Sequence, residues 1–244
     1  MENYIDILRQ LDADEQEEMR KYDMRTSMKT DMAAKTIPIH NEIIIQGWFT
    51  FAPEYSHTNN GEEFYTGILE VPRESGTHDK IPVTISQFSI NEKLQTYQMY
   101  RFKGEIRTRN IHNSNTDRIE LELTVFVTEQ LPVIMGVDNN KVELEGYVCK
   151  APIVRKTPYG KNVCDILLAV NRKYKKSDYV PCVTWGRCAI RSEHFDVGDC
   201  LHVYGRLQSR DYIKRHPDGS KTTHTTYELS ISRFDLKGNN RHDK

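Results

Sequence analysis

Aromatic and basic residues are interleaved in two stretches of the second half of this 244-residue chain. Residues 171–179 read Asn-Arg-Lys-Tyr-Lys-Lys-Ser-Asp-Tyr, and residues 210–216 read Arg-Asp-Tyr-Ile-Lys-Arg-His. A flat ring can stack on the face of an unpaired base, while neighbouring lysine and arginine side chains neutralise the phosphates. The pattern is therefore typical of a surface that binds single-stranded nucleic acid.

The charge of the chain is divided unevenly between its halves. Its formal net charge is −1, yet residues 138–244 carry 20 Lys and Arg against 13 Asp and Glu, a net charge of +7. The remaining residues carry 14 basic against 22 acidic side chains. The basic second half favours a polyanionic partner, although an excess of solvated lysines would produce the same count.

The sequence contains an internal repeat, in which the pattern of strands that must position these residues occurs twice. Residues 43–47 (Ile-Ile-Ile-Gln-Gly) correspond to residues 142–146 (Val-Glu-Leu-Glu-Gly), which lie 99 positions later. Residues 102–106 correspond to residues 203–207 at a shift of 101. We therefore expect two domains of the same fold, each of roughly 100 residues.

Periodicity predicts the same order of elements in both repeats. Strands are expected near 41–51, 63–71, 80–88, 99–111 and 118–128, and again near 140–150, 162–171, 179–186, 199–212 and 224–233. A short helix is expected between the third and fourth strands, starting from capping-box spacing at residues 89–92 in repeat one and near 187–195 in repeat two. This order is that of the OB-fold, so the prediction is an all-β chain with two tandem five-stranded OB-fold barrels.

The composition along the chain suggests where the domains begin and end. We predict a charged, partly helical N-terminal segment at 1–36 and a divergent OB domain at 37–130. A linker at 131–139 leads to a single-stranded DNA-binding OB domain at 140–235, and a short polar tail follows at 236–244. The N-terminal segment has nine acidic and six basic residues, a net charge of −3.

Alternation along the strands of repeat two predicts which side chains face outward. In the fourth strand, Leu201, Val203 and Leu207 share the inward face. The opposite face carries a mixture of rings and bases, namely His202, Tyr204, Arg206, Gln208, Arg210 and Tyr212. In the third strand, Tyr179 and Trp185 have the parity that faces away from the core.

Residues 140–234 resemble bacterial single-stranded DNA-binding proteins of the OB-fold family. The matching motifs occur in family order across the domain: Asn140-Lys141-Val142 with Gly146, Ala151-Pro152, Thr157 with Gly160, residues 168–172 (Leu-Ala-Val-Asn-Arg), Trp185-Gly186, Val197-Gly198-Asp199, residues 205–208 (Gly-Arg-Leu-Gln) and Tyr227-Glu228. The resemblance implies that this chain binds and protects single-stranded DNA in replication, recombination or repair.

The resemblance also implies the residues that make the contacts. Bases would stack on Tyr174, Tyr179, Trp185 and Tyr212. Phosphates would be bound by Arg172, Lys173, Arg187, Arg206 and Arg210, with Lys161, Lys214, Arg215 and Lys221 on the flanking loops.

Repeat one lacks rings at the corresponding positions, which hold Ser75, Lys80, Ser86 and Ile111. We therefore expect an assembly or accessory role for repeat one, with weak or backbone-only DNA contact as the alternative. By resemblance, two chains would form a homodimer that supplies four OB units. Replication and repair proteins stay possible partners, but the family's acidic C-terminal tip is absent, because the sequence ends with residues 239–244 (Asn-Asn-Arg-His-Asp-Lys).

Several classes of protein are disfavoured by the sequence. We find no nucleophile constellation, phosphate-cradling glycine loop or paired-carboxylate motif, so an enzyme is not expected. The five cysteines lack C-x-x-C spacing, and neither they nor His216 and His224 form a recognised ligand set, so no metal or cofactor is expected. Without an apolar run of roughly 18 residues or a signal-peptide pattern, a cytoplasmic protein without membrane association is predicted.

Two other functions stay open at this point. An RNA-binding OB protein would present the same surface, because stacking rings do not distinguish DNA from RNA. An assembly or regulatory subunit could instead use the rings of repeat two to contact another protein.

Overall fold

The chain folds almost entirely into strands. The computed structural model describes residues 40–113, 118–172, 176–215 and 220–238. The N-terminal segment predicted to be partly helical lies outside the described residues, as do Lys173 and Tyr174. The structure describes no helix with the length and hydropathy that a membrane span requires.

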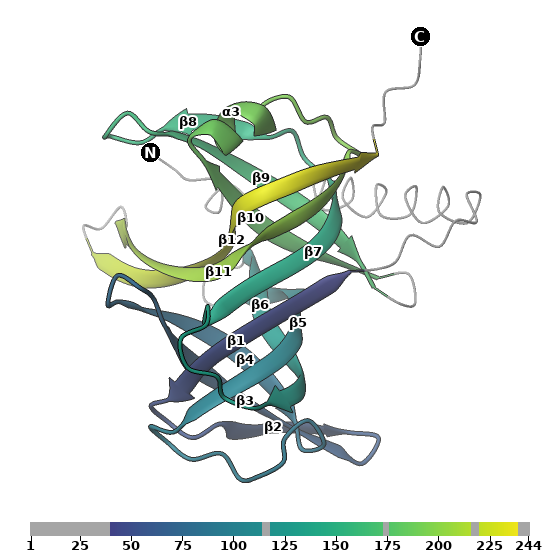
Figure 1. Cartoon of the computed structure of the whole chain (residues 1–244), viewed down its shortest axis with the longest axis vertical. Coiled ribbons are helices and arrows are strands. Elements are labelled where there is room, and N and C mark those ends of the chain that lie inside the picture. Colours follow the sequence, from purple (N-terminus) through teal and green to yellow (C-terminus); the bar gives the residue numbers. More distant parts are fainter. Residues whose placement is uncertain (1–39, 114–117, 173–175, 216–219, 239–244) are drawn as a thin grey trace, which may run out of the picture.

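Two barrels follow each other along the chain (Figure 1). Repeat one contains β1 (Asn41–Phe49), β2 (Glu54–Asn59), β3 (Glu62–Pro72), β4 (His78–Ser86), β5 (Met99–Asn113) and β6 (Arg118–Leu131). Repeat two contains β7 (Asn140–Val148), β8 (Ile153–Lys156), β9 (Asn162–Asn171), β10 (Ser177–Trp185), α3 (Arg187–Ser192), β11 (Cys200–Arg215) and β12 (Lys221–Gly238).

The pairing of the strands is the same in both repeats and confirms the OB-fold. In repeat one, β1 pairs antiparallel with β3 and β5, and β4 pairs in parallel with β6. In repeat two, β7 pairs with β9 and β11, and β10 pairs in parallel with β12. Each barrel also has one short strand beyond the five predicted, β2 or β8, which forms a hairpin with the following strand.

The predicted helix of repeat one is wrong. The described residues 87–98 form turns and no helix, whereas α3 occupies the corresponding place in repeat two. The backbone donors of this segment bond outside it, because Asn91 N donates to Gln130 Oε1 at 3.0 Å and Tyr97 N donates to Phe49 O at 2.8 Å. Leu94 is the segment's buried hydrophobic anchor, which is too little to hold an amphipathic helix against the barrel.

The two barrels are joined edge to edge through β1 and β7. These strands pair antiparallel, with Ile43 opposite Val142, and give one twelve-stranded sheet (Figure 1). Ile43 and Val142 are equivalent in the repeat, so the pairing has the symmetry of a pseudo-twofold axis. Both side chains are buried, and a single hydrophobic cluster extends through both barrels.

A buried carboxylate at each end of the junction strengthens it. Asp178 is fully buried, accepts a hydrogen bond from Arg172 Nε at 2.5 Å and also accepts from the backbone N–H of Thr108 in the other repeat. Tyr179 N then donates to Thr108 Oγ1 at 2.8 Å. We call this group the Asp178 latch.

The symmetry of the repeat produces a second latch around Asp79. Its carboxylate pairs with Arg73 and accepts from Ser209 N of repeat two at 2.7 Å. Lys80 N donates to Ser209 Oγ at 2.8 Å. Each repeat therefore binds the fourth strand of the other through an Arg-Asp pair, which fixes β11 relative to repeat one.

Candidate nucleic-acid interface

Trp185 is a half-exposed ring at the end of β10. Its side chain is 42% exposed, and Gly186 follows with a φ of 58°, a left-handed value that turns the chain into α3. Arg187 is exposed two residues after the ring. An exposed ring and an exposed cation thus lie two residues apart in the chain at this corner of repeat two.

Tyr179 lies at the other end of β10 and faces the same side of the sheet. The two residues are six positions apart in the strand, which corresponds to about 20 Å. Its ring is partly buried in a small outer cluster with Cys149, Ile153 and Leu167. Tyr179 is therefore a packed ring with one accessible part, whereas Trp185 is open.

The outer face of β10 between these rings is not open. Pro181 and Val183 have the same parity as the rings, yet both are buried, and Leu167 on β9 lies opposite Pro181. Alternation alone predicted that this face of the strand points away from the core. The structure restricts the accessible rings of β10 to its two ends, because apolar side chains also pack on the outer face of β9.

The β11–β12 hairpin extends away from the barrel and is seen at the left of Figure 1. Arg206 and Arg210 are exposed on it, as predicted from alternation. Tyr212 is opposite His224 of β12, and their rings stack with centroids 5.6 Å apart at an interplanar angle of 26°. The stacking orients the Tyr212 ring before any ligand arrives.

Several other predicted residues lie near the tip of this hairpin. The backbones of Lys214 and Arg215 belong to β11, but their side chains lie outside the described residues. Lys221 is exposed and lies opposite Arg215 in the pairing of β11 with β12.

Arg172 occupies a different environment from the one predicted. Its guanidinium pairs with Asp178 and donates from a terminal nitrogen to Thr108 O at 2.9 Å. Three quarters of the side chain is buried in the Asp178 latch. We therefore assign Arg172 to the junction between the repeats and not to a phosphate.

The β8–β9 hairpin carries an exposed ring that was not among the site residues predicted from the sequence. Tyr159 is 91% exposed at its turn, between exposed Lys156 and Lys161. Thr157 N donates to Lys161 O at 2.9 Å and Gly160 has a φ of 76°, which closes the turn. The Pro-Tyr-Gly turn flanked by two lysines was the signal that could have identified it.

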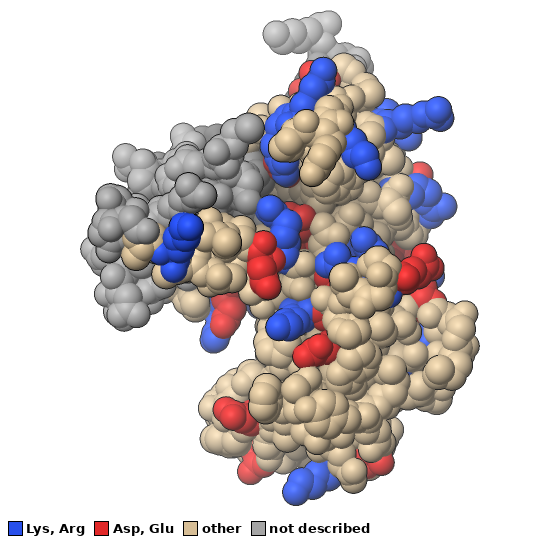
Figure 2. Space-filling view, turned by 90° about the vertical axis from the view of Figure 1, so that its left-hand side faces the viewer, with Lys and Arg blue, Asp and Glu red and all other residues tan. Residues whose placement is uncertain are grey.

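Lysine and arginine side chains gather over the repeat-two half and the middle of the face that bears the β11–β12 hairpin (Figure 2). The repeat-one half of this face has only scattered charges. The distribution agrees with the excess of basic residues counted in the second half of the sequence.

Residues of repeat one, together with Arg172 of repeat two, line a groove with a volume of about 1060 Å³. Rings line it at positions other than those compared in the sequence: Phe51, His57, Phe64 and Phe126. Phe51 is 82% exposed, and His57 stacks on Phe64 with centroids 4.9 Å apart. The sequence comparison missed these rings because the first and second repeats place aromatic residues on different strands.

The chain is similar to known single-stranded DNA-binding proteins. The model of the "Single-strand binding protein family" matches residues 139–236. Single-stranded DNA-binding protein A of Bacillus subtilis (strain 168) is 40% identical over 80 residues, which are 30% of this chain and 46% of that protein. Single-stranded DNA-binding protein 2 of Streptococcus agalactiae serotype III (strain NEM316) is 36% identical over 104 residues, or 40% of this chain and 76% of that protein.

The chain thus spans about half the length of the Bacillus relative and three quarters of the Streptococcus relative. Among solved structures, the wild-type single-stranded DNA binding protein from Thermus aquaticus matches with a TM-score of 0.61. The match covers 84% of this chain and 96% of that one at 19% identity, so it supports the two-barrel fold alone.

Proposed function

The chain belongs to the single-strand binding protein family, and from this premise we propose that repeat two binds and protects single-stranded DNA without catalysing a reaction. The observation that carries the proposal is the open Trp185 ring beside the exposed Arg187, on the barrel that matches the family. In this proposal residues 140–235 form the DNA-binding domain and residues 37–130 the divergent one.

Bases would stack on Trp185 and Tyr212, with Tyr174, Tyr159 and the accessible part of Tyr179 as further platforms. The phosphates would be held by the basic residues that surround these rings, namely Lys161, Lys173, Arg187, Arg206, Arg210, Lys214, Arg215 and Lys221. Every base has a π face and every nucleotide a phosphate, so binding would show little sequence preference.

The cellular role would be to coat exposed single strands during replication, recombination or repair in the cytoplasm. A homodimer would bring four OB units to the same strand. The groove of repeat one, with Phe51 at its rim, offers a second surface over which the strand could continue, which favours DNA contact by repeat one over a purely accessory role.

The direct test is fluorescence anisotropy of labelled oligo-dT with Trp185→Ala and Tyr212→Ala. Stacking is worth about 1–3 kcal/mol per base, so each substitution should weaken binding about 5- to 150-fold. Phe88→Ala is the matched control, because Phe88 is a 75% exposed ring in repeat one that does not line the groove of that repeat. Affinities equal to that of the control would refute the proposed contacts.

The same assay separates the alternatives. Competition between DNA and RNA oligomers of matched sequence tests the RNA-binding alternative, which requires RNA to displace the DNA at equal or lower concentration. If folded Trp185→Ala and Tyr212→Ala proteins bind oligo-dT unchanged, an assembly subunit that uses these rings to contact protein becomes the better account.

A further inference from the structure

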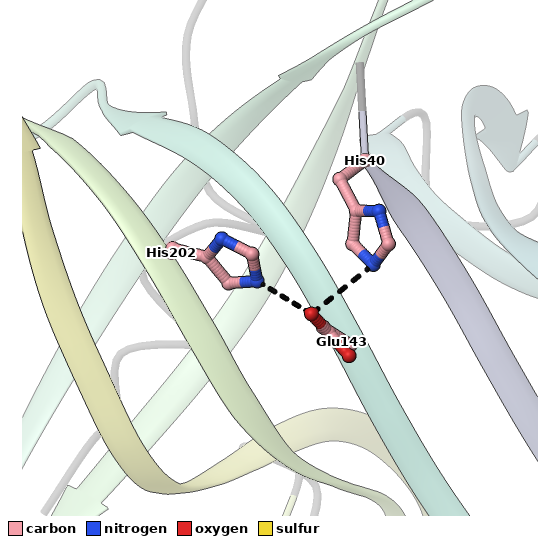
Figure 3. Close-up of side chains that lie close together, drawn as sticks. All are labelled: His40, Glu143 and His202. Carbon is pink, nitrogen blue, oxygen red and sulfur yellow. Dashed lines mark hydrogen bonds and ion pairs between the residues drawn. The ribbon is translucent and has the colours of Figure 1, made fainter. Parts of the chain in front are cut away.

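Three side chains with metal-binding groups meet where the two barrels join. His40 lies immediately before β1, Glu143 is on β7, and His202 is on β11 (Figure 3). Nε2 of His202 is 2.9 Å from Oε1 of Glu143, and Nε2 of His40 is 3.5 Å from the same oxygen. The three potential ligand atoms all lie within 4.8 Å of one another.

The backbone holds these positions in place. β7 lies between β1 and β11 and pairs with both, so the three residues come from adjacent strands. Glu145 N donates to His40 O at 2.8 Å, which extends the β1–β7 pairing to His40. The cluster therefore depends on the same pairing that joins the repeats.

The cluster leaves one polar atom unsatisfied. Nε2 of His40 is buried and has no hydrogen-bond partner among the described residues. Its contact with Glu143 at 3.5 Å is an ion pair only if the imidazole is protonated. A buried nitrogen without a partner is costly, and a cation between the three side chains would satisfy it.

The chemistry and the spacing fit a zinc ion. Two imidazoles and one carboxylate are a known three-residue zinc ligand set that leaves a fourth position to water. With zinc bonds of about 2.0–2.2 Å, neighbouring donors in a tetrahedron lie about 3.3–3.6 Å apart. The two distances from Glu143 Oε1, 2.9 and 3.5 Å, are close to this value, and the nitrogens of the two histidines lie within 4.8 Å of each other.

His202 has the surroundings of a metal-bound histidine. Its second nitrogen, Nδ1, lies 3.5 Å from Oε2 of Glu145, which is the carboxylate-histidine arrangement that orients imidazole ligands. The ring also stacks on Tyr204 with centroids 4.8 Å apart, and its side chain is only 13% exposed. The side chains of His40 and Glu143 are more exposed, at 37% and 31%, although Nε2 of His40 itself is buried.

We propose that His40, Glu143 and His202 bind a divalent transition-metal ion, with Zn²⁺ as the best match, and that the ion ties the start of β1 to repeat two. No motif in the sequence points to this site, and we expected no metal from the sequence. The two histidines are far apart in the chain, and only the pairing of β1, β7 and β11 brings them together.

The test is calorimetric titration of the full, EDTA-treated chain with ZnCl₂, followed by the absorption spectrum with Co²⁺. One ion per chain should bind and raise the melting temperature, and the Co²⁺ spectrum should be that of a four-coordinate site without a thiolate charge-transfer band. The spectral criterion matters because Cys200 Sγ lies 3.7 Å from Oε1 of Glu145. A thiolate band would overturn the proposed ligand set.

His40→Ala should abolish binding of this ion without affecting the fold, because His40 precedes β1 and is 37% exposed. Glu143→Gln should do the same. Glu145→Gln should keep the site but weaken it about 10- to 100-fold, as loss of an outer partner does. His78→Ala, which removes another histidine that faces a carboxylate, is the control and should bind normally. No saturable binding, or full binding by His40→Ala, would overturn the proposal.

Discussion

Trp185 and Tyr212 are the residues on which the proposed function depends most, and the chain presents them differently. Trp185 stands at a strand end where Gly186 turns the backbone away, so both its exposure and its direction follow from the turn. Tyr212 is held by the stacked ring of His224. A ring that is already oriented loses less entropy when a base stacks on it.

The cysteines of repeat two provide a prediction at the residue scale. Burial raises the pKa of the Cys164 and Cys200 thiols to about 12 and that of Cys182 well above its usual value. The Cys149 thiol, which donates to Leu167 O at 3.3 Å, also has its pKa raised to about 12 by burial. Since only the thiolate reacts, these four should be alkylated slowly at pH 8 and faster as the pH rises toward 12.

Mass spectrometry after brief treatment with iodoacetamide at pH 8 measures this directly. We expect one modification per native chain, at the half-exposed Cys188, and five after denaturation. Rapid labelling of Cys164 or Cys182 in the native protein would contradict the packing described for β9 and β10.

The exposure of a side chain could be predicted from the sequence where alternation along its own strand decides it. It could not be predicted where contacts with a distant segment of the chain decide it. The outward direction of Arg206 and Arg210 follows from the period of a strand. The pairing of Arg172 with Asp178 and Thr108 depends on how the other repeat docks, and no spacing in the sequence encodes it. The zinc ligand set was missed for the same reason.

At the scale of elements, Gly205 determines the course of β11. Pairing with β12 shifts here, because Tyr204 lies opposite Arg233 and Gly205 opposite Ile231. A Cβ atom on Gly205 would lie 2.2 Å from Ser230 O, so Gly205→Ala should destabilise the protein by about 1–3 kcal/mol through overpacking. Urea unfolding measures the loss.

Gly238→Ala is the control for this substitution, since a Cβ there would meet only Cys200 Cβ at 3.9 Å. Equal stability of the two variants would contradict the close approach of β11 and β12. The equivalent Gly104 in repeat one has the same kind of contact, with Phe126 O at 2.5 Å, which shows that the repeat preserves the bulge as well as the strands.

The latches between the repeats predict how much stability is lost when one of their hydroxyl groups is removed. Thr108→Val removes the hydroxyl that accepts from Tyr179 N and leaves a partly buried donor unsatisfied, which should cost about 1–3 kcal/mol. Ser209→Ala removes the equivalent acceptor for Lys80 N at a more exposed position, where water can replace it, so the loss should be smaller. Equal losses in urea unfolding would show that the two latches do not differ in burial as described.

The order of the elements was largely predictable, because strand periodicity and the repeated pattern are local signals. The helix predicted to start at residues 89–92 does not form, although these residues have the spacing of a capping box. The backbone N–H groups of Asn91 and Tyr97 donate instead to Gln130 Oε1 and Phe49 O. These long-range hydrogen bonds take the place of the hydrogen bonds that a helix would form. The short strands β2 and β8 were missed because their hairpins carry no clear apolar alternation.

At the scale of the whole molecule, one duplicated barrel has diverged in charge and in the placement of its rings. Repeat two carries the basic excess and the open Trp185, whereas repeat one carries the groove rimmed by Phe51. The β1–β7 pairing and the two latches hold these surfaces in one fixed arrangement. A single DNA strand could therefore meet both surfaces without rearrangement of the barrels.

The most direct measurement is the tryptophan fluorescence of a Trp48→Phe protein titrated with oligo-dT at two salt concentrations. Trp48 is the other tryptophan, in repeat one beside His78, so its removal leaves Trp185 as the reporter. Stacking of bases on Trp185 predicts strong, saturable quenching. The logarithm of the binding constant should fall with the logarithm of salt by about 0.7 per phosphate contacted. Fluorescence that stays unchanged while the DNA binds, or binding that does not weaken with salt, would contradict the proposed interface.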